Sequence, residues 1–456
     1  MQMRDQSLWS LTVARSAEGR RLSDDRSAIR IADLKDGSCF NIDVKSMRGC
    51  SVLILTATQL TAALAAIELD GIAERILLCT PEILPHVASI LTTANVDTIV
   101  SDDSAAFDGI VATVKCRSEL FPLDNTTLVR NVDTAWVLFT SGTTGQPKMV
   151  VHTLASLTGP LGNPPSDAGE TVWSTFYDIR RYGGLQILLR ALIGGGSMVL
   201  SNSSEAVGDF LTRLAAAGVT HLSGTPSHWR RALMSPAASA ITPQYVRLSG
   251  ETADQAILDR LHAAYPTATV AHAFASTEAG VAFDVRDGLA GFPATYLTGR
   301  SDAGVEMRIE DGTLRIRSAR GALQYMDQPL RATEGFIDTG DVVEQRGNRC
   351  YFMGRREGVI NVGGQKVYPE EIENIITRHP DVLMAKVWPR KSPILGAIVA
   401  ADVMLRTPVP DARFEAISQA LRSACQQSLP AYKIPATWRQ VETIELSTSG
   451  KVQRTP

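Results

Sequence analysis

The sequence predicts an α/β fold with two parts: a large N-terminal domain of α/β subdomains that ends in a β-rich section, and a small C-terminal α+β domain. Three observations predict this. From about residue 50, short β-branched or aliphatic runs alternate with helical patterns, as in parallel α/β architecture. After about residue 300, polar and apolar residues alternate instead. About a hundred residues of mixed strand and helix pattern then follow a turn-rich stretch, and 456 residues exceed one typical domain.

The parallel α/β part begins with a predicted buried strand at 52–55 and an Ala/Leu-rich helix that ends near Gly71. Strands at 75–78 and 98–100 follow, with a helix from Pro81 between them. Gly218 occupies the position of a helix C-terminal cap. The same alternation of strands and helices resumes at 197–200, 205–217, 219–223, 245–249, 254–265 and 269–274.

The β-rich section contains the run at 313–317, whose alternating residues are typical of a half-buried antiparallel strand. The turn-rich stretch at 354–358 then separates this section from the C-terminal part. We therefore predict a large domain over 1–353, a hinge over 354–358 and a small domain over 359–456.

Composition and charge exclude several classes of protein. Lys plus Arg number 45 and Asp plus Glu 48, so the net charge of −3 provides no global attraction for nucleic acid. The six cysteines show no C-x-x-C pair and no zinc spacing, which favours a reducing compartment. The N-terminus lacks a signal-peptide pattern, and the longest apolar stretch, at 51–69, is too polar to span a membrane. We expect a cytoplasmic protein that is a monomer or a homodimer.

The strongest local signal is the stretch 139–148, which reads F-T-S-G-T-T-G-Q-P-K and follows the apolar run 135–138. A loop that leaves a strand with two glycines and several hydroxyl residues can present N–H and O–H donors to phosphate oxygens, and Lys148 adds a positive charge. Its lysine is not in the position of a P-loop lysine. A flexible Gly/Ser/Thr turn is the alternative interpretation.

This stretch, with several motifs that follow it, resembles the adenylate-forming enzymes: acyl- and aryl-CoA ligases, adenylation domains and firefly-type luciferases. The loop carries their S/T-S-G-S/T-T-G-x-P-K signature intact. Residues 274–278, F-A-S-T-E, are similar to the family's Y-G-x-T-E, with Ala275 in place of glycine. Residues 336–341 are similar to its (Y/W)-x-x-T-G-D, and 450–454 to its terminal G-K-x-x-R.

The resemblance implies a role for each matching residue. An aromatic residue stacks on adenine, a threonine meets the α-phosphate, a glutamate holds Mg²⁺, and an aspartate binds the ribose. The implied catalytic residues are Lys451, Glu278, Thr277 and Lys148, with Glu278 also the Mg²⁺ ligand. The implied ATP- and AMP-binding residues are Thr140, Ser141, Gly142, Thr143, Thr144, Gly145, Gly250, Glu251, Phe274, Asp341 and Arg355.

The resemblance also implies that the small domain is mobile. Glu357 matches the pivot residue, where most relatives have Asp or Lys, and the loop Gly363, Gly364, Gln365 matches the one that lines a thiol tunnel after rotation. The implied reaction couples an acid to AMP with release of pyrophosphate and then transfers the acyl group to a thiol. The implied cofactors are ATP, Mg²⁺ and coenzyme A, or the phosphopantetheine of a carrier protein.

The organic acid is less clear from the sequence. In relatives the acid pocket is lined partly by the segment before 183–185, and here this segment offers Tyr177, Asp178, Arg181 and Gly184. The arginine could bind a second acidic group, and the aspartate could bind an amine; a charged helix start is the alternative. Five residues follow Lys451, so we expect any acyl carrier protein to act only in trans. A nucleotide-binding protein without catalysis is the competing class.

Overall fold

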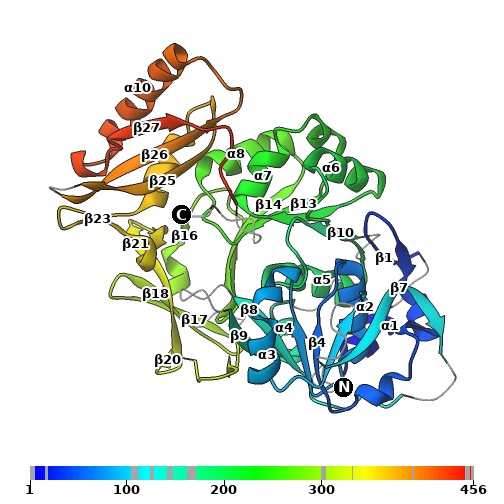
Figure 1. Cartoon of the computed structure of the whole chain (residues 1–456). Helices are drawn as coiled ribbons and strands as arrows, with labels where there is room; N and C mark the ends of the chain where they lie inside the picture. The colour runs from blue at the N-terminus through cyan, green and yellow to red at the C-terminus, as the bar shows by residue number, and fades with distance from the viewer. Residues whose placement is uncertain are drawn as a thin grey trace.

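The computed structural model describes residues 6–15, 19–103, 111–123, 128–140, 147–161, 171–298, 304–330, 332–392, 395–446 and 452. A large N-terminal domain is followed by a small C-terminal domain (Figure 1). The helices are α1 (Leu8–Val13), α2 (Gln59–Leu69), α3 (Val87–Thr93), α4 (Leu154–Thr158), α5 (Tyr182–Gly194), α6 (Val207–Ala216), α7 (Pro226–Ala232), α8 (Gln255–Ala264), α9 (Pro369–Ile376) and α10 (Asp411–Ser428).

The first sheet of the large domain, here called the β8 sheet, is built around parallel strands buried on both faces. Val52 and Ile54 pack on one face, whereas Leu53 packs on the other, and all three are fully buried. This explains the continuous apolar run in the sequence. The strands, in spatial order, are β19 (Gln324–Tyr325), β9 (Lys148–Thr153), β8 (Ala135–Thr140), β5 (Arg75–Leu78), β4 (Ser51–Ile54), β6 (Thr98–Ser101), β7 (Ala112–Pro122) and β3 (Gly37–Phe40).

A second sheet, the β13 sheet, shares a core with the first. Helices α2 and α5 contribute to the cluster between the two sheets, while α6, α7 and α8 cover the far face of the β13 sheet and α3 the far face of the β8 sheet. The large domain is therefore layered helix, sheet, helix, sheet, helix. The strands, in spatial order, are β15 (Gly280–Val285), β14 (Thr269–Ser276), β13 (Tyr245–Ser249), β12 (His221–Gly224), β10 (Val172–Thr175), β11 (Ser197–Val199), β1 (Arg21–Ser23) and β2 (Ala28–Arg30).

A third, antiparallel sheet closes the large domain. Leu314 and Ile316 are buried in its core while Arg317 is exposed, as the alternating pattern predicts. Its strands are β16 (Phe292–Pro293), β22 (Arg349–Arg355), β21 (Phe336–Arg346), β18 (Thr313–Ser318) and β17 (Val305–Glu310), with β20 (Ala332–Thr333) paired to β21.

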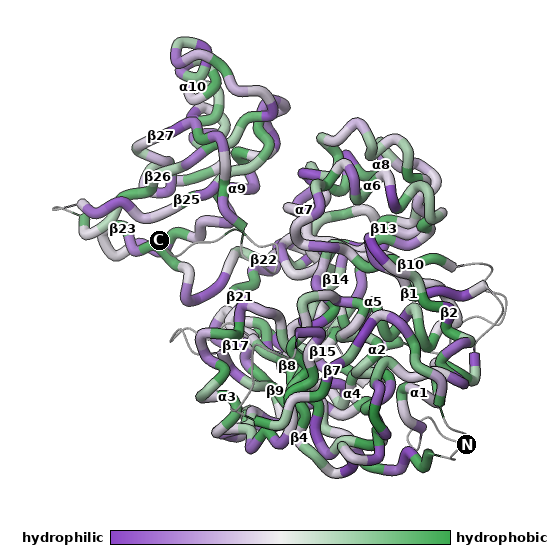
Figure 2. The backbone as a smooth tube through the Cα atoms, turned by 45° about the vertical axis from the view of Figure 1, so that its right-hand side comes forward, coloured by the Kyte–Doolittle hydropathy of each residue, from purple (hydrophilic) through white to green (hydrophobic). Residues whose placement is uncertain are grey.

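The small domain begins after β22 and has its own hydrophobic core. Figure 2, turned by 45°, shows it as a separate lobe that the chain enters from β22. Helices α9 and α10 pack together on its strands, of which β25 and β26 pair in antiparallel and β26 and β27 in parallel orientation. The strands are β23 (Ile360–Val362), β24 (Gln365–Val367), β25 (Val382–Ser392), β26 (Gly396–Leu405) and β27 (Thr437–Gln440).

The predicted strands and helices of the large domain are confirmed within a few residues, and Gly218 has the positive φ of +63° expected of a helix cap. One expectation differs. The helix predicted from Pro81 begins as a 3₁₀ segment, Pro81–His86, and becomes α-helical only as α3. Pro85 lacks an N–H donor, so an α-helical turn cannot be completed across it.

Candidate active site

Most of the predicted site residues that the structure describes line one cavity of about 1050 Å³ between the large and small domains. Strand ends of the β8 and β13 sheets form one side, and β21, β22 and α9 form the other. This volume suits a ligand of nucleotide size or larger. The expected site residues that line it are Thr140, Lys148, Tyr177, Asp178, Arg181, Gly184, Gly250, Glu251, Phe274, Thr277, Glu278, Asp341, Arg355 and Glu357.

Thr277 and Glu278 lie in the tight turn between β14 and β15. The turn ends at Gly280, which has a φ of +79° and whose Cβ, if present, would lie 2.6 Å from the Arg320 carbonyl oxygen. Only glycine fits this close approach. The Thr-Glu pair is thus held at a strand end and does not begin a helix, which was the alternative interpretation of such a pair.

A buried histidine holds this turn from the neighbouring sheet. His152 of β9 is fully buried, and its Nε2 lies 2.8 Å from the Thr277 carbonyl oxygen. Because a carbonyl only accepts, Nε2 carries the proton and Nδ1 faces the Ser156 hydroxyl at 3.2 Å. Burial lowers the pKa of His152 to about 4. The neutral ring therefore acts as a fixed donor to the backbone of the turn.

A carboxylate and a lysine adjoin this turn. The Tyr325 hydroxyl donates to Glu278 Oε1 at 3.2 Å, and the Lys148 ammonium lies 5.6 Å from the centre of the Tyr325 ring. One carboxylate and one cation thus face the cavity side by side. A carboxylate can bind Mg²⁺ and a lysine can pair with phosphate oxygens, so the two together suit a magnesium-bound phosphate.

The donor set is consistent with Mg²⁺ rather than with a metal held by protein alone. Among the described residues, no three His, Cys, Asp or Glu side chains come together as a metal cluster. Mg²⁺ is commonly bound through one or two carboxylates, with phosphate oxygens and waters as the other ligands. Glu278 fits that role.

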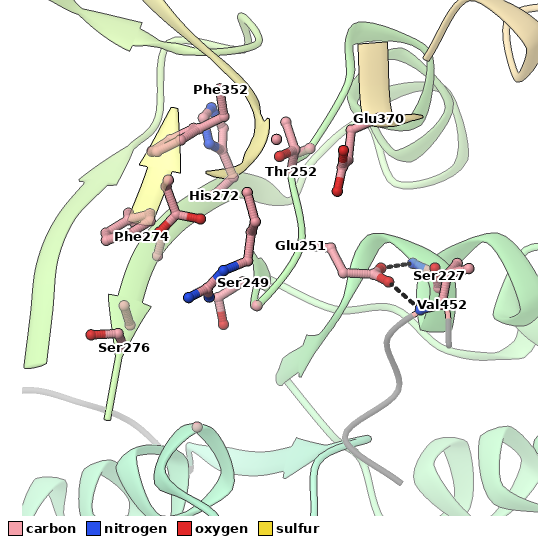
Figure 3. Close-up of a pocket in the computed structure, with 18 of the residues that line it drawn as sticks. Ser227, Ser249, Glu251, Thr252, His272, Phe274, Ser276, Phe352, Glu370 and Val452 are labelled. Atoms are coloured by element: carbon pink, nitrogen blue, oxygen red, sulfur yellow. Dashed lines mark hydrogen bonds between the residues drawn. The ribbon is translucent and has the colours of Figure 1, made fainter. Parts of the chain in front are cut away.

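Stacked aromatic rings form another wall of the cavity. Phe274 stacks against Phe352 with ring centres 5.0 Å apart and planes tilted by 9°, and Phe283 lies beyond (Figure 3). Phe274 and Phe352 are half-buried, and all three rings line the cavity. An apolar wall of this kind suits the flat face of a purine.

Asp341 and Arg355 face each other across the β21–β22 ladder. The Asp341 N–H donates to the Thr339 hydroxyl at 3.1 Å, and an Arg355 N–H donates to the Thr339 carbonyl at 3.2 Å. Thr339, which is buried, therefore fixes both residues at the cavity edge. Asp341 lies within strand β21.

The residues expected to bind the acid lie at the start of α5. The Tyr177 hydroxyl donates to the Ser249 carbonyl at 2.7 Å, and burial raises the pKa of this phenol. Both carboxylate oxygens of Asp178 accept from Arg180, at 2.9 and 2.6 Å, and Arg181 pairs with Glu82 at 2.5 Å. A substrate amine or a second carboxylate would thus compete with an internal ion pair.

Gly184 allows the chain to pass close to this ion pair. A Cβ at this position would lie 2.2 Å from the Asp178 carbonyl oxygen, which is a severe overlap. The glycine in this segment therefore serves a close backbone approach.

Glu251 follows β13 and bridges two N–H groups (Figure 3). Its Oε2 accepts from the Ser227 N–H of α7 at 2.9 Å, and its Oε1 accepts from the Val452 N–H at 3.3 Å. The second contact joins residues 201 positions apart and connects the chain's C-terminal segment to the large domain.

Several predicted site residues are not placed at the cavity. Ser141, Gly142, Thr143, Thr144, Gly145 and Lys451 lie outside the described residues. Gly363 and Gly364 form the two-residue turn of the β23–β24 hairpin, with φ of +55° and +84°, and neither they nor Gln365 line the cavity. In this arrangement the predicted thiol loop, 363–365, therefore lies outside the lining of the cavity.

The sequence did not single out three residues that the structure adds to the site: His152, Tyr325 and Phe352. His152 lies in the strand directly after the phosphate loop, and its place in an otherwise apolar run was a detectable signal. Pairing of β22 with β21 brings Phe352 to the cavity, and pairing of β19 with β9 brings Tyr325 to Glu278, which lines it. Local sequence contains no sign of either pairing.

Comparison with known proteins gives two family matches. Residues 47–322 match the model of the AMP-binding enzymes, and residues 371–451 match the AMP-binding enzyme C-terminal domain. Among curated proteins, tyrocidine synthase 3 of Brevibacillus parabrevis is 27% identical over 356 residues, covering 71% of this chain and 5% of that protein. The 2-succinylbenzoate–CoA ligase of Staphylococcus aureus strain MRSA252 is 25% identical over 338 residues, covering 71% and 66%.

The aligned part thus spans less than two thirds of these two relatives. Among solved structures, a variant of MenE from E. coli with bound OSB-AMS has a TM-score of 0.76 at 21% identity, with 95% of each chain covered. This likeness shows that the two chains share a fold, including the large and small domains.

Proposed function

We propose that this chain, which belongs to the family of AMP-binding enzymes, activates a carboxylic acid with ATP and then forms a thioester with coenzyme A. One observation carries the proposal. Lys148, Glu278, Asp341 and Arg355 come from separate parts of the chain, yet all line a single cavity between the two domains. Such convergence is needed where a triphosphate and an acid must be held together.

The first step is attack by a substrate carboxylate oxygen on the α-phosphorus of ATP, with pyrophosphate as the leaving group and an acyl-adenylate as the product. Phe274 and Phe352 hold the adenine, and Asp341 accepts from the ribose hydroxyls. Thr277 donates to the α-phosphate, while Lys148 and Lys451 neutralise the charge that develops on the phosphates. Glu278 would hold Mg²⁺ together with phosphate oxygens, and the bound ion would supply charge stabilisation for the leaving pyrophosphate.

In the second step a thiolate attacks the acyl carbonyl carbon, AMP leaves, and a thioester results. We propose that the small domain, residues 359–456, rotates about 354–358 for this step and carries Lys451 away. The β23–β24 turn, with Gly363, Gly364 and Gln365, then faces the thiol. Glu357 is exposed on the hinge and lines the cavity, which supports its role as pivot.

We propose a small organic acid as substrate, bound between Tyr177 and the start of α5. The names of the relatives point to 2-succinylbenzoate as the first acid to test, since the similar ligases of Staphylococcus aureus and Listeria monocytogenes are named for that acid. An acid with an apolar ring would pack on Tyr177. An acid with an added charged group would have to exchange with the Arg180–Asp178 or Arg181–Glu82 pair.

The proposal is tested by ATP–pyrophosphate exchange with a panel of acids that includes 2-succinylbenzoate, benzoate and straight-chain acids. We expect exchange that depends on one class of acid. Lys451→Ala should lower that exchange by at least about 100-fold because a charge-neutralising group is lost from the transition state. Unchanged circular dichroism would show that the variant is folded. Exchange at the wild-type rate in the folded variant would contradict the role of Lys451, and no AMP with any acid would contradict the function.

A carrier protein is the alternative acceptor, and the match to a segment of tyrocidine synthase 3 is the reason to test it. Mass spectrometry after incubation with acid, ATP, coenzyme A and a phosphopantetheinylated carrier distinguishes the two. We expect acyl-CoA as the product. Acylated carrier without acyl-CoA would favour a stand-alone adenylation enzyme.

We also propose a cytoplasmic location. All six cysteines are free thiols, and five of them are buried. Free thiols persist in a reducing compartment. No helix in the described part of the chain is long and apolar enough to cross a bilayer.

A further inference from the structure

We propose that Glu251 is a positioning residue that holds the C-terminal segment against the large domain during adenylate formation. This inference rests on the proposed function, in which Lys451 must reach the α-phosphate. Val452 is the residue directly after Lys451. Because a peptide group is planar, a contact to the Val452 N–H also restricts the Cα of the residue before it.

The carboxylate of Glu251 is committed to two N–H groups of the protein. Oε2 accepts from Ser227 at 2.9 Å and Oε1 accepts from Val452 at 3.3 Å, so one side chain joins the first turn of α7 to the C-terminal segment (Figure 3). The Ser227 contact lies within the large domain and orients the carboxylate. The other oxygen, Oε1, faces the C-terminal segment and accepts from Val452.

Neighbouring contacts support the same docking. An Arg231 N–H of α7 donates to the Ile444 carbonyl at 3.3 Å, and burial, offset by the nearby Glu251 carboxylate, lowers the pKa of this arginine. Leu446 pairs with Val452 as an antiparallel bridge, and both pack against the cluster of Leu383, Met384 and Ile444. Val452 thus contacts the small domain through its side chain and the large domain through its N–H.

The hydrogen bond between Glu251 and the Val452 N–H, here called the clamp, can form and break as the small domain moves. It uses backbone N–H groups, so it does not depend on the side chain at position 452. A single charge-assisted hydrogen bond shifts an equilibrium between two arrangements by roughly 10- to 100-fold. This is enough to favour the arrangement for adenylation while leaving the small domain free to rotate.

The first test measures the domain arrangement without any substrate acid. Dyes are placed at Met234→Cys and Tyr432→Cys, which are 40% and 37% exposed, in a Cys50→Ser background whose other cysteines are buried. A chain truncated after Leu446 gives the energy-transfer efficiency without the clamp. We expect Glu251→Gln and Val452→Pro, which removes the N–H donor, to move the efficiency toward the truncated value.

Glu205→Gln is the matched control. Both of its carboxylate oxygens accept from Arg213 within the large domain, at 2.9 and 2.6 Å, so the same chemical change is made away from the small domain. Its transfer efficiency should equal that of the wild type. Wild-type efficiency in Glu251→Gln would overturn the proposal, and so would an equal change in Glu205→Gln.

The second test separates the two half-reactions with whichever acid supports exchange in the wild type. Glu251→Gln should lower ATP–pyrophosphate exchange by roughly 10- to 100-fold. Conversion of the supplied, chemically prepared adenylate to acyl-CoA should fall by a smaller factor than the exchange does, since that step does not need the contact between Glu251 and Val452. Equal losses in both steps would overturn the proposal. If the wild type shows no exchange with any acid, the proposed function fails. The energy-transfer test then still shows whether Glu251 holds the C-terminal segment against the large domain.

Discussion

Replacing His152 with glutamine removes a titratable group from the core of the large domain and keeps an N–H donor for the Thr277 carbonyl. His152 is fully buried, and burial lowers its pKa from 6.5 to about 4. In the unfolded chain the imidazole binds a proton as the pH falls through about 6.5, whereas the folded protein resists protonation until about pH 4. The unfolded state therefore gains protons first, so the free energy of unfolding decreases as the pH is lowered from about 6.5 to about 4.

The size of this loss of stability follows from the two pKa values. At pH 5 the unfolded imidazole is almost fully protonated and the folded one is almost neutral. The free energy of unfolding is therefore about 2 kcal/mol lower at pH 5 than at pH 7. Urea unfolding at both values of pH measures it. We expect the wild type to lose about 2 kcal/mol more than His152→Gln on going from pH 7 to pH 5.

The control is His262→Gln, which removes an exposed histidine of α8. This variant should keep the pH dependence of the wild type. Equal losses of unfolding free energy in the wild type and in His152→Gln would refute the assignment of a neutral, buried imidazole to this position.

Two further predictions concern the start of α5. Arg180→Met should destabilise the large domain by about 3–5 kcal/mol in urea unfolding, because it leaves the Asp178 carboxylate without the guanidinium that now binds both its oxygens; a loss below about 1 kcal/mol would contradict this. Gly184→Ala should lower the melting temperature and raise the KM for the acid, since its Cβ would lie 2.2 Å from the Asp178 carbonyl oxygen; an unchanged KM would show that this segment does not shape the acid site.

Much of the fold could be predicted from the sequence, because its signals are local. The strand at 52–55 reads as a continuous apolar run since it is buried on both faces, and the strand at 313–317 alternates since only one face is buried. The sequence also named Lys148, Glu278 and Asp341 as site residues, and all three line one cavity. Whether they bind ATP stays a prediction.

The remainder depends on contacts between distant segments. His152 reaches Thr277 across 125 positions, and Glu251 reaches Val452 across 201. Neither pair has a sequence signature, because each contact ends on a backbone group. Every residue type has the carbonyl, and every residue type except proline has the N–H. The internal pairing of Asp178 with Arg180 was equally invisible, although the two residues are neighbours in the chain, because either could have faced a substrate.

The Arg180–Asp178 ion pair and the Glu251–Val452 hydrogen bond differ in strength, and this difference suits a fixed pocket wall and a moving domain. The Arg180–Asp178 pair is buried and bidentate, and breaking such a pair costs about 3–5 kcal/mol, so it can hold a pocket wall through every turnover. The Glu251 contact to Val452 is one longer hydrogen bond to a charged group, worth about 1.5–3 kcal/mol at most. A domain that must dock for one half-reaction and leave for the next needs the weaker kind. A buried ion pair at position 251 would slow thioester formation by holding Lys451 at the adenylation site.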